Sequence, residues 1–411
     1  MSASAPVSAA AEAVLTFLES VGRRSEAEFY LRLFLKLPKE SFGIIAPGAT
    51  VVRYALGSLV EQLKFLADLG LYAPVVLGLY DPERGAQSSE RLVKRLPASG
   101  MEPCPHEMGE AGLAETLRAE LRAERLPVVH FRALEGQTIE DRLNELGTLA
   151  KALDTRKFVL LRRRGGLRPR ASGKLELAPG YYLPTDAGRI SIINLRTDRD
   201  GIASGKALPK RDAELLAAAE RLIALAQPSP MLASVTSPLN LLKELFTVKG
   251  AGTLIKLGSA VARHGSYAEL DVERLRRLLE ASFGRALDAQ FFEHAPLAVY
   301  VEADYRGAAV VCASTPVPYL SKFAVEPEAQ GEGMGRDLWE AMSRDYPALY
   351  WRGRAENPIA SWYASVCDGM VRLPEWNVYW RGVETARIPE IIEAARARPP
   401  DFARGALDAT R

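Results

Sequence analysis

Tyr319-Leu-Ser-Lys-Phe-Ala-Val-Glu-Pro-Glu-Ala-Gln-Gly-Glu-Gly-Met-Gly335 is the stretch that decides the fold of the second half of this chain, and Arg336-Asp-Leu-Trp-Glu-Ala-Met342 follows it directly. The mostly apolar start predicts a strand, and the last seven residues have the period of an amphipathic helix. The glycines between them allow a turn with little side-chain bulk. Such a helix start presents unpaired backbone N–H groups and the positive end of the helix dipole, so it predicts a site for a pyrophosphate.

The elements that follow extend the pattern. A second strand is expected over 348–354, a short helix around Trp362 and Tyr363, and a further strand over 376–380. This order of strand, helix, strand, helix and strand, with the glycine loop, resembles the GCN5-related N-acetyltransferases, in which the loop holds the pyrophosphate of acetyl-coenzyme A. The resemblance implies acetyl-coenzyme A as co-substrate. For the loop alone, an ordinary tight turn between strand and helix is the alternative.

The length and the charge of the chain limit the number of domains and the kinds of partner that can be expected. The chain has 411 residues, which suggests two or three domains. Its 53 Lys and Arg nearly balance its 51 Asp and Glu, so nucleic acid or a membrane is not expected as the main partner. No apolar run is long enough to span a bilayer, and the first residues lack the features of a signal peptide. We therefore expect a cytoplasmic protein.

The three cysteines and four histidines show no spacing typical of a metal site, so no metal is expected. Cys104 and His106 are close neighbours in the segment Pro103-Cys-Pro-His106. We expect this segment to be a loop rather than a catalytic nucleophile with its base.

In the first half of the chain, apolar runs alternate with helical periodicity. This alternation predicts a largely parallel sheet with helices on both faces. Strands are expected near 42–46, 73–78, 128–131 and 158–161, and helices near 56–66, 113–122, 139–153 and 212–225. We expect a hinge over 258–266. The expected parts are a helix or tail over 1–24, a first domain over 25–260, a second over 266–396, and a frayed tail over 397–411.

A more specific resemblance covers nearly the whole chain. Residues 319–382 resemble the acetyltransferase domain of vertebrate-like N-acetylglutamate synthases, through motifs such as Tyr350-Trp-Arg-Gly-Arg354 and Asn357-Pro-Ile359. Residues 236–254 resemble the end of the amino-acid-kinase domain in the same family. The resemblance implies an α/β amino-acid-kinase-like domain followed by an α+β acetyltransferase domain. It also implies acetyl transfer to L-glutamate in arginine biosynthesis, and a homo-oligomer.

The kinase-like domain departs from its family at the phosphate loops. The first strand should end in a lysine and a Gly-Gly pair, but the sequence is Ile44-Ile-Ala-Pro-Gly-Ala49. Proline removes a backbone N–H where donors would hold phosphate. The second glycine loop is replaced by Gly78-Leu-Tyr-Asp-Pro82. We therefore expect no kinase activity. A bifunctional synthase and kinase, and a non-catalytic arginine-responsive regulatory subunit, are the alternatives.

The resemblance assigns the site residues. Acetyl-coenzyme A is expected at Phe323, Ala324, Val325, Gln330, Gly331, Gly333, Gly335 and Arg336. The two carboxylates of glutamate are expected at Lys322, Arg352, Arg354 and Asn357, with both arginines on one side of their strand. Tyr363 is the expected proton donor to the thiolate, and Asn357 is the second expected catalytic residue. An aromatic core residue is the alternative for Tyr363. For Arg336, the alternative is a solvated position on the helix.

The end of the first domain carries one further expected site. Lys249, Gly250, Gly252 and Thr253 resemble the segment that binds L-arginine in related arginine-sensitive enzymes. Glycines there would let backbone groups approach a ligand closely. A helix C-terminus with glycine caps is the alternative.

Overall fold

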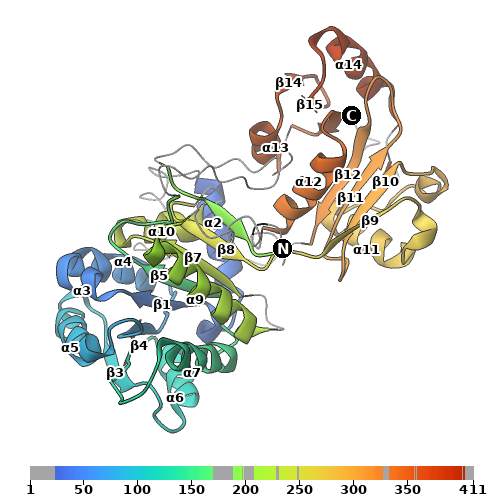
Figure 1. Cartoon of the computed structure of the whole chain (residues 1–411). Coiled ribbons are helices and arrows are strands. Elements are labelled where there is room, and N and C mark those ends of the chain that lie inside the picture. The colour runs from blue at the N-terminus through green and yellow to red at the C-terminus, as the bar shows by residue number, and fades with distance from the viewer. Residues whose placement is uncertain are drawn as a thin grey trace. The chain divides into compact units, whose positions relative to one another are not determined.

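The computed structural model describes residues 24–169, 188–196, 198, 208–227, 231–247, 250–326, 333–355, 357, 359–399 and 401–402. The chain divides into two compact units, Met1–Leu257 and Gly258–Arg411 (Figure 1). Each unit has its own sheet and its own core, and each is described by itself below.

The first unit is built on an eight-stranded sheet in the order β3-β4-β2-β1-β5-β7-β8-β6. Its strands are β1 Ile44–Pro47, β2 Val75–Leu77, β3 Pro103–Glu107, β4 Leu126–His130, β5 Lys157–Leu161, β6 Ile192–Asn194, β7 Leu232–Thr236 and β8 Thr253–Lys256. Neighbouring strands are parallel except for the antiparallel pair β7 and β8. The expectation of a largely parallel sheet is confirmed.

Helices cover both faces of this sheet because successive strand residues point to opposite sides. The helices are α2 Arg24–Leu35, α3 Ala49–Tyr54, α4 Leu56–Asp68, α5 Gly85–Arg95, α6 Leu113–Arg122, α7 Ile139–Ala152, α9 Lys210–Ala226 and α10 Leu241–Phe246. Ile44 and Ala46 pack in one buried cluster with α6, α7 and α9. Ile45, between them, packs in the other cluster with α2, α4 and α10.

The segment with Cys104 and His106 is a strand, so the expectation of a loop there is wrong. Pro103 and Pro105 lack the N–H that a central strand needs, and they suggested a loop for that reason. The segment forms β3 at the edge of the sheet and pairs with β4 on one side alone. An edge strand tolerates proline because its outer side has no ladder to complete.

The second unit is built on a seven-stranded sheet in the order β14-β15-β13-β12-β11-β10-β9. Its strands are β9 Val261–His264, β10 Ala298–Glu302, β11 Gly307–Cys312, β12 Tyr319–Val325, β13 Leu349–Gly353, β14 Gly369–Arg372 and β15 Asn377–Arg381. Strand β9 pairs with β10, so the unit begins before the expected residue 266, and the expected hinge contributes a strand to the sheet.

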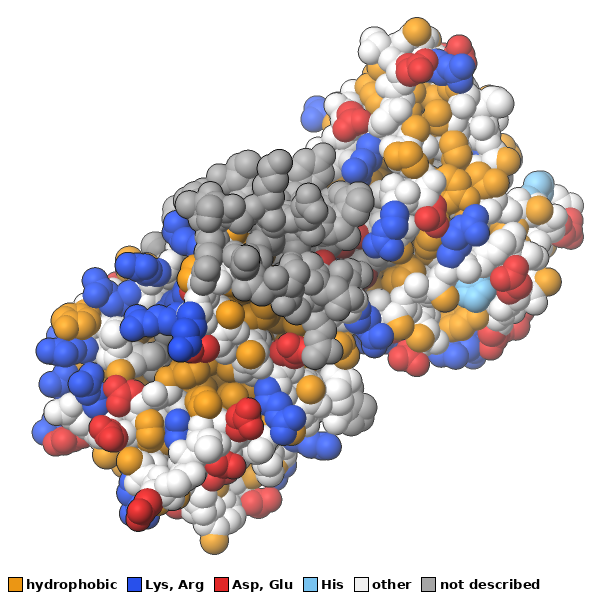
Figure 2. Space-filling view, in the orientation of Figure 1, with side chains coloured by type: hydrophobic (Ala, Val, Ile, Leu, Met, Phe, Trp, Pro, Cys, Tyr) orange, Lys and Arg blue, Asp and Glu red, His pale blue; other side chains and the backbone are white. Residues whose placement is uncertain are grey.

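In the described part of the second unit, α-helices flank the sheet (Figure 1). They are α11 Val272–Phe283, α12 Met334–Asp345, α13 Ala360–Val366 and α14 Ile388–Ala397. Phe323 and Trp351 face one side, where they pack with α12 and α13. Ala324 packs on the opposite side with α11, and Tyr350 packs with α14. On the visible face of this unit, basic and acidic side chains are mixed rather than gathered in one patch (Figure 2).

The expectation of a frayed tail after residue 397 needs correction for its first residues. Phe402 packs against the α11 core, and its backbone bridges to Leu287. Residues 403–411 lie outside the described residues. Within the described part of the chain, no helix is long and apolar enough to cross a membrane.

Gly85 gives a test of the packing in the first unit. It begins α5, and a Cβ there would overlap the carbonyl oxygen of Phe131. We expect Gly85→Ala to lower the stability of the first unit by about 1–3 kcal/mol, as overpacking usually does. The control is Gly57→Ala in α4, where a Cβ meets open space and helix propensity favours alanine. Urea unfolding measures both, and equal midpoints for the two variants would contradict this packing.

Candidate active site

The centre of the second unit is the point where β12 and β13 part. These two parallel strands are in register at one pair, Tyr319 and Tyr350. The pairing of β12 with β13 stops at this pair, although β12 continues to Val325 and β13 continues to Gly353, where it is paired with β15 on its other side. The edge of β12 that faces β13 can therefore accept an extended ligand that carries amide groups, as an added strand would.

The expected pyrophosphate loop leads directly from this edge into α12. Gln330 and Gly331 lie outside the described residues. Gly333 caps the helix with a φ of 79°, a left-handed conformation that suits glycine. Gly335 lies against the strand, since a Cβ there would be 3.6 Å from the side chains of Phe323 and Val325. The start of α12 is thus held beside the end of β12. A pyrophosphate at the N–H groups of this helix start stays a prediction.

The side chain of Arg336 already has a partner within its own helix. Its Nε donates to Glu340 at 2.7 Å, one turn later on the same helix. This ion pair matches the alternative of a helix-surface arginine. The structure leaves a phosphate contact at Arg336 as a prediction.

Tyr363 lies in the aromatic core under β13. Its side chain is buried, with ring centroids 5.7 Å from Trp351 and 5.4 Å from Tyr379. Burial raises the pKa of its hydroxyl well above the usual range, and Tyr319 and Tyr379 add to the effect. The hydroxyl therefore stays protonated at neutral pH and can donate a proton but not accept one. This buried position is the one expected for an aromatic core residue, the alternative given for Tyr363 above. Its catalytic role stays a prediction.

The expected cations lie on the opposite face of the sheet from α12. Lys322 is 3% exposed and forms an ion pair with Asp401. Its ammonium lies 4.9 Å from the ring centroid of Phe291 and 5.0 Å from that of Phe402. Burial lowers the pKa of Lys322, and Asp401 opposes that effect.

Arg352 and Arg354 share one side of their strand, as the sequence predicts. Both guanidinium groups lie over the ring of Trp376, at 4.4 and 5.1 Å from its centroid. Arg354 is exposed, whereas Arg352 is partly buried and donates to three backbone carbonyls near the end of the chain. Asn357 follows Arg354 closely, and its side-chain oxygen accepts from the N–H of Ile359 at 3.1 Å, which fixes the turn before α13.

Two charged residues here were not predicted from the sequence. Arg398 lies 4.0 Å over the ring of Tyr319, and Asp401 contacts Lys322 and Ser321. Both come from the segment expected to fray. The available signal was Pro399-Pro-Asp-Phe402, where an acidic and an aromatic residue follow two prolines in an Ala- and Arg-rich tail.

The comparisons with known proteins agree with this geometry. Residues 262–398 match the family described as N-acetyltransferase of N-acetylglutamate synthase. The second unit is an N-acetyltransferase domain of this family.

Relatives of this acetyltransferase extend over both units. The chain is 29% identical to a protein of Xanthomonas campestris named acetylglutamate kinase, over 91% of this chain and 98% of the relative. It is also 29% identical to the mitochondrial N-acetylglutamate synthase of Mus musculus, over 89% of this chain and 75% of the relative. The chain therefore resembles proteins of both names across the kinase-like unit and the acetyltransferase domain.

A solved structure supports the same fold. It is the N-acetylglutamate synthase of Neisseria gonorrhoeae in complex with coenzyme A and N-acetylglutamate. The TM-score is 0.52 at 15% identity, and the match covers 87% of this chain and 97% of that one. This likeness confirms the fold class, an amino-acid-kinase-like unit joined to an acetyltransferase domain.

The kinase-like unit that precedes the acetyltransferase domain has little space at its expected phosphate loops. A cavity of about 90 Å³ lies where β1 and β2 end, lined by Pro47, Gly48, Gly78 and Tyr80 among others. Arg162 also lines it, but its guanidinium is engaged by Asp212. Pockets for cofactors usually measure about 300–1,000 Å³, so this one is small for a nucleotide triphosphate.

The expected arginine segment of the kinase-like unit is closed around an acidic side chain. Oε2 of Glu244 accepts from the N–H groups of Ala251 and Gly252 at 2.7 and 2.6 Å. Gly250 has a φ of 61°, and Thr253 donates to a backbone carbonyl in the core. Lys249 lies outside the described residues. Arginine binding at this segment stays a prediction.

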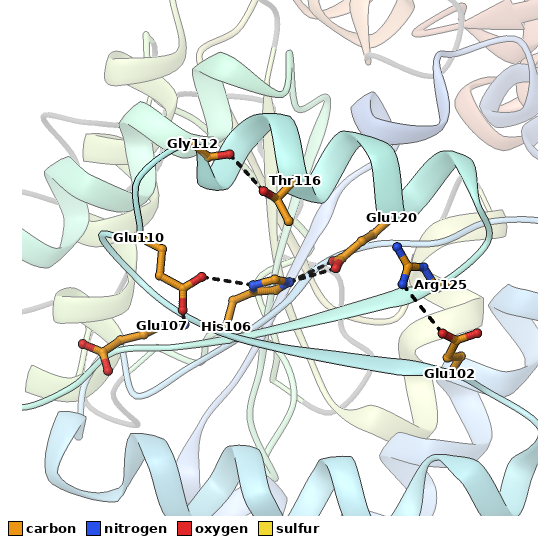
Figure 3. Close-up of polar contacts among 8 residues, drawn as sticks. All are labelled: Glu102, His106, Glu107, Glu110, Gly112, Thr116, Glu120 and Arg125. Atoms are coloured by element: carbon orange, nitrogen blue, oxygen red, sulfur yellow. Dashed lines mark hydrogen bonds and ion pairs between the residues drawn. The ribbon is translucent and has the colours of Figure 1, made fainter.

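Cys104 and His106 of the kinase-like unit are not paired as nucleophile and base. Figure 3 shows the imidazole of His106 between two carboxylates, Glu110 at 3.1 Å and Glu120 at 2.9 Å. Burial raises the pKa of the Cys104 thiol to about 11, and Glu120 adds to this effect. In the described part of the chain, no group of three or more His, Cys, Asp or Glu could hold a metal ion.

Proposed function

We propose that this chain is an N-acetylglutamate synthase, which transfers the acetyl group of acetyl-coenzyme A to the α-amine of L-glutamate. The observation that carries the proposal is the position of the basic side chains. Lys322 lies on β12 and Arg352 on β13, with Arg354 just past the end of β13, so the cations flank the opening between the two strands of an acetyltransferase domain. An acceptor with two carboxylates needs cations at this place.

The donor lies along β12. The pantetheine amides pair with the open edge beside Phe323, Ala324 and Val325, and the pyrophosphate sits at the start of α12, at Gly333 and Gly335. Gln330 and Gly331 would complete the phosphate loop. This arrangement directs the thioester into the opening between the two strands.

The acceptor meets the thioester from the cationic face. Arg354 is exposed and its guanidinium lies over the ring of Trp376, so this contact would orient it for a carboxylate before glutamate binds. Asn357 offers its amide beside Arg354. Lys322 supplies a buried positive charge nearby. Fixing both carboxylates places the amine against the acetyl carbonyl, and such positioning supplies a large part of the rate enhancement.

The reaction then needs one proton at the leaving group. The neutral amine attacks the acetyl carbon, a C–N bond forms, and the C–S bond breaks to release a thiolate. Tyr363 would donate its proton to this sulfur, since its hydroxyl is protonated at neutral pH. The proton lost by the amine passes to solvent.

A bifunctional synthase and kinase is the second candidate. It is favoured by the full-length similarity to the Xanthomonas campestris protein named acetylglutamate kinase. Against it stand the small cavity, Pro47 in place of a backbone donor, and the absence of a lysine from β1. We therefore assign the first unit a structural role, with L-arginine as its proposed effector. A homo-oligomer in the cytoplasm completes the proposal.

The test is the release of coenzyme A thiol from acetyl-coenzyme A in the presence of each amino acid. We expect rapid release with L-glutamate and far slower release with aspartate or glutamine, because each changes the spacing or charge of the two carboxylates. Equal turnover with lysine or with a protein amine would overturn the assignment of glutamate.

Arg354→Ala should raise the KM for glutamate, because it removes a charge-assisted contact made in both the ground state and the transition state. We expect an increase of about 10- to 100-fold, the size of one hydrogen bond to a charged group. Arg372→Ala is the matched control, an exposed arginine at the end of β14. An unchanged KM for glutamate would remove Arg354 from the site.

Tyr363→Phe should lower kcat with little change in either KM, because the ring stays in its core position while the proton donor is lost. General acid catalysis is usually worth about 10²–10⁴-fold. Thermal unfolding of the variant checks that the aromatic core is intact. A fully active Phe variant would leave Tyr363 with a packing role alone.

A further inference from the structure

The end of the chain crosses the cationic face of the acetyltransferase domain. We call Arg398, Pro399, Asp401 and Phe402 the C-terminal strap. Phe402 packs on Phe283 of α11 with ring centroids 5.0 Å apart. The carbonyl of Asp401 accepts from the N–H of Asp288 at 3.0 Å. The strap is therefore fixed to the core of the unit at its far end.

Arg352 holds the near end of the strap. Its Nη1 donates to the carbonyls of Ala395 and Arg398 at 2.7 and 2.9 Å, and its Nη2 donates to that of Pro399 at 2.8 Å. Three bonds from one guanidinium fix the path of the backbone from α14 into the strap. Arg352 therefore acts mainly on the strap, and Arg354 is left as the exposed arginine of the pair.

Between these two anchors, the strap brings one carboxylate to Lys322. Oδ2 of Asp401 contacts the ammonium of Lys322 and accepts from the hydroxyl of Ser321 at 3.3 Å. Phe291 and Phe402 cover the ammonium from two sides. A buried ammonium without a counter-ion would lose its proton or destabilise the fold, because desolvation of a charge is costly. Asp401 is the carboxylate that keeps this lysine charged and fixes its direction.

We propose that Asp401 is a positioning residue of the acceptor site, which acts on glutamate binding through Lys322. The proposal rests on the proposed function. Lys322 is the deepest of the three cations, and its field at the opening between β12 and β13 depends on its being protonated and held in one direction. The strap is therefore part of the active site, although it lies 79 residues from Lys322 in the sequence.

A displaceable gate is the competing interpretation, in which the carboxylate of Asp401 blocks Lys322 until glutamate replaces it. The anchors argue against it. Leaving Lys322 would require the strap to break its bonds to Arg352 and Asp288 and to expose Phe402. The two interpretations predict opposite changes in the KM for glutamate.

The experiment is steady-state kinetics on the full chain with Asp401→Asn, Asp401→Glu, Lys322→Met and the double variant Lys322→Met/Asp401→Asn. We expect Asp401→Asn to raise the KM for glutamate about 10- to 100-fold, with the KM for acetyl-coenzyme A unchanged. Asp401→Glu should recover most of the loss. In the Lys322→Met background, Asp401→Asn should change the KM for glutamate little further, because the two residues act as one pair.

The control is Glu393→Gln, which removes an exposed carboxylate of α14 that pairs with Arg396. A chain that ends after Phe402 should keep the wild-type KM for glutamate, and one that ends after Ala397 should not. If Asp401→Asn alone fails to fold, the two Lys322→Met variants keep the proposal testable, since neither leaves a buried ammonium unpaired. An unchanged KM for glutamate in Lys322→Met, or a further increase in the double variant, would then overturn it.

An unchanged or lowered KM for glutamate in folded Asp401→Asn would overturn the proposal, and a lowered value would favour the gate. A further large increase from Lys322→Met to the double variant would also overturn it, because Asp401 would then act without the lysine. A wild-type chain that does not use glutamate would overturn the proposed function itself. If the wild-type chain acetylates glutamate and Asp401→Asn leaves the KM for glutamate unchanged, this inference alone would be overturned.

Discussion

The separation of β12 from β13 is the constraint on which the rest of the second unit depends. The two strands share one register pair, Tyr319 and Tyr350, and then part. The parting leaves part of the edge of β12 unpaired, and we propose that the donor binds along this edge and that the acceptor amine reaches the thioester between the two strands. Helix α12 begins where β12 ends, and the aromatic residues around Trp351 fill the space beneath.

The basic side chains of the site differ in whether they are available to a substrate or are held by other parts of the protein. Arg354 is exposed and oriented by Trp376, so it is suited to a substrate carboxylate. Arg352 instead donates to three backbone carbonyls near the end of the described chain. Lys322 is held by Asp401, and we propose that it acts on the acceptor from this fixed position. A buried cation needs a partner in the absence of substrate, and the strap provides it. The terminal segment thus stabilises the site that the strands define.

The sequence predicted those parts that local patterns determine. The strand, glycine turn and helix over 319–342 have distinct periods, and the two-residue period placed Arg352 and Arg354 on one side. It did not predict β3, since prolines at a sheet edge look like a loop. It also did not predict the contact of Asp401 with Lys322, because no local period reports on a tail residue 79 positions away. The aromatic surroundings of Tyr363 come from three elements that meet only in the folded unit.

The central claim is that the second unit performs the chemistry and the first unit transfers no phosphate. Mass spectrometry of one mixture tests it most directly, with the chain, L-glutamate, acetyl-coenzyme A, ATP and magnesium present together. We expect N-acetyl-L-glutamate to accumulate while the ATP is unchanged. Phosphorylated N-acetylglutamate with ADP in equal amount would contradict the account of the first unit, and the absence of N-acetyl-L-glutamate and its phosphate would contradict the account of the second.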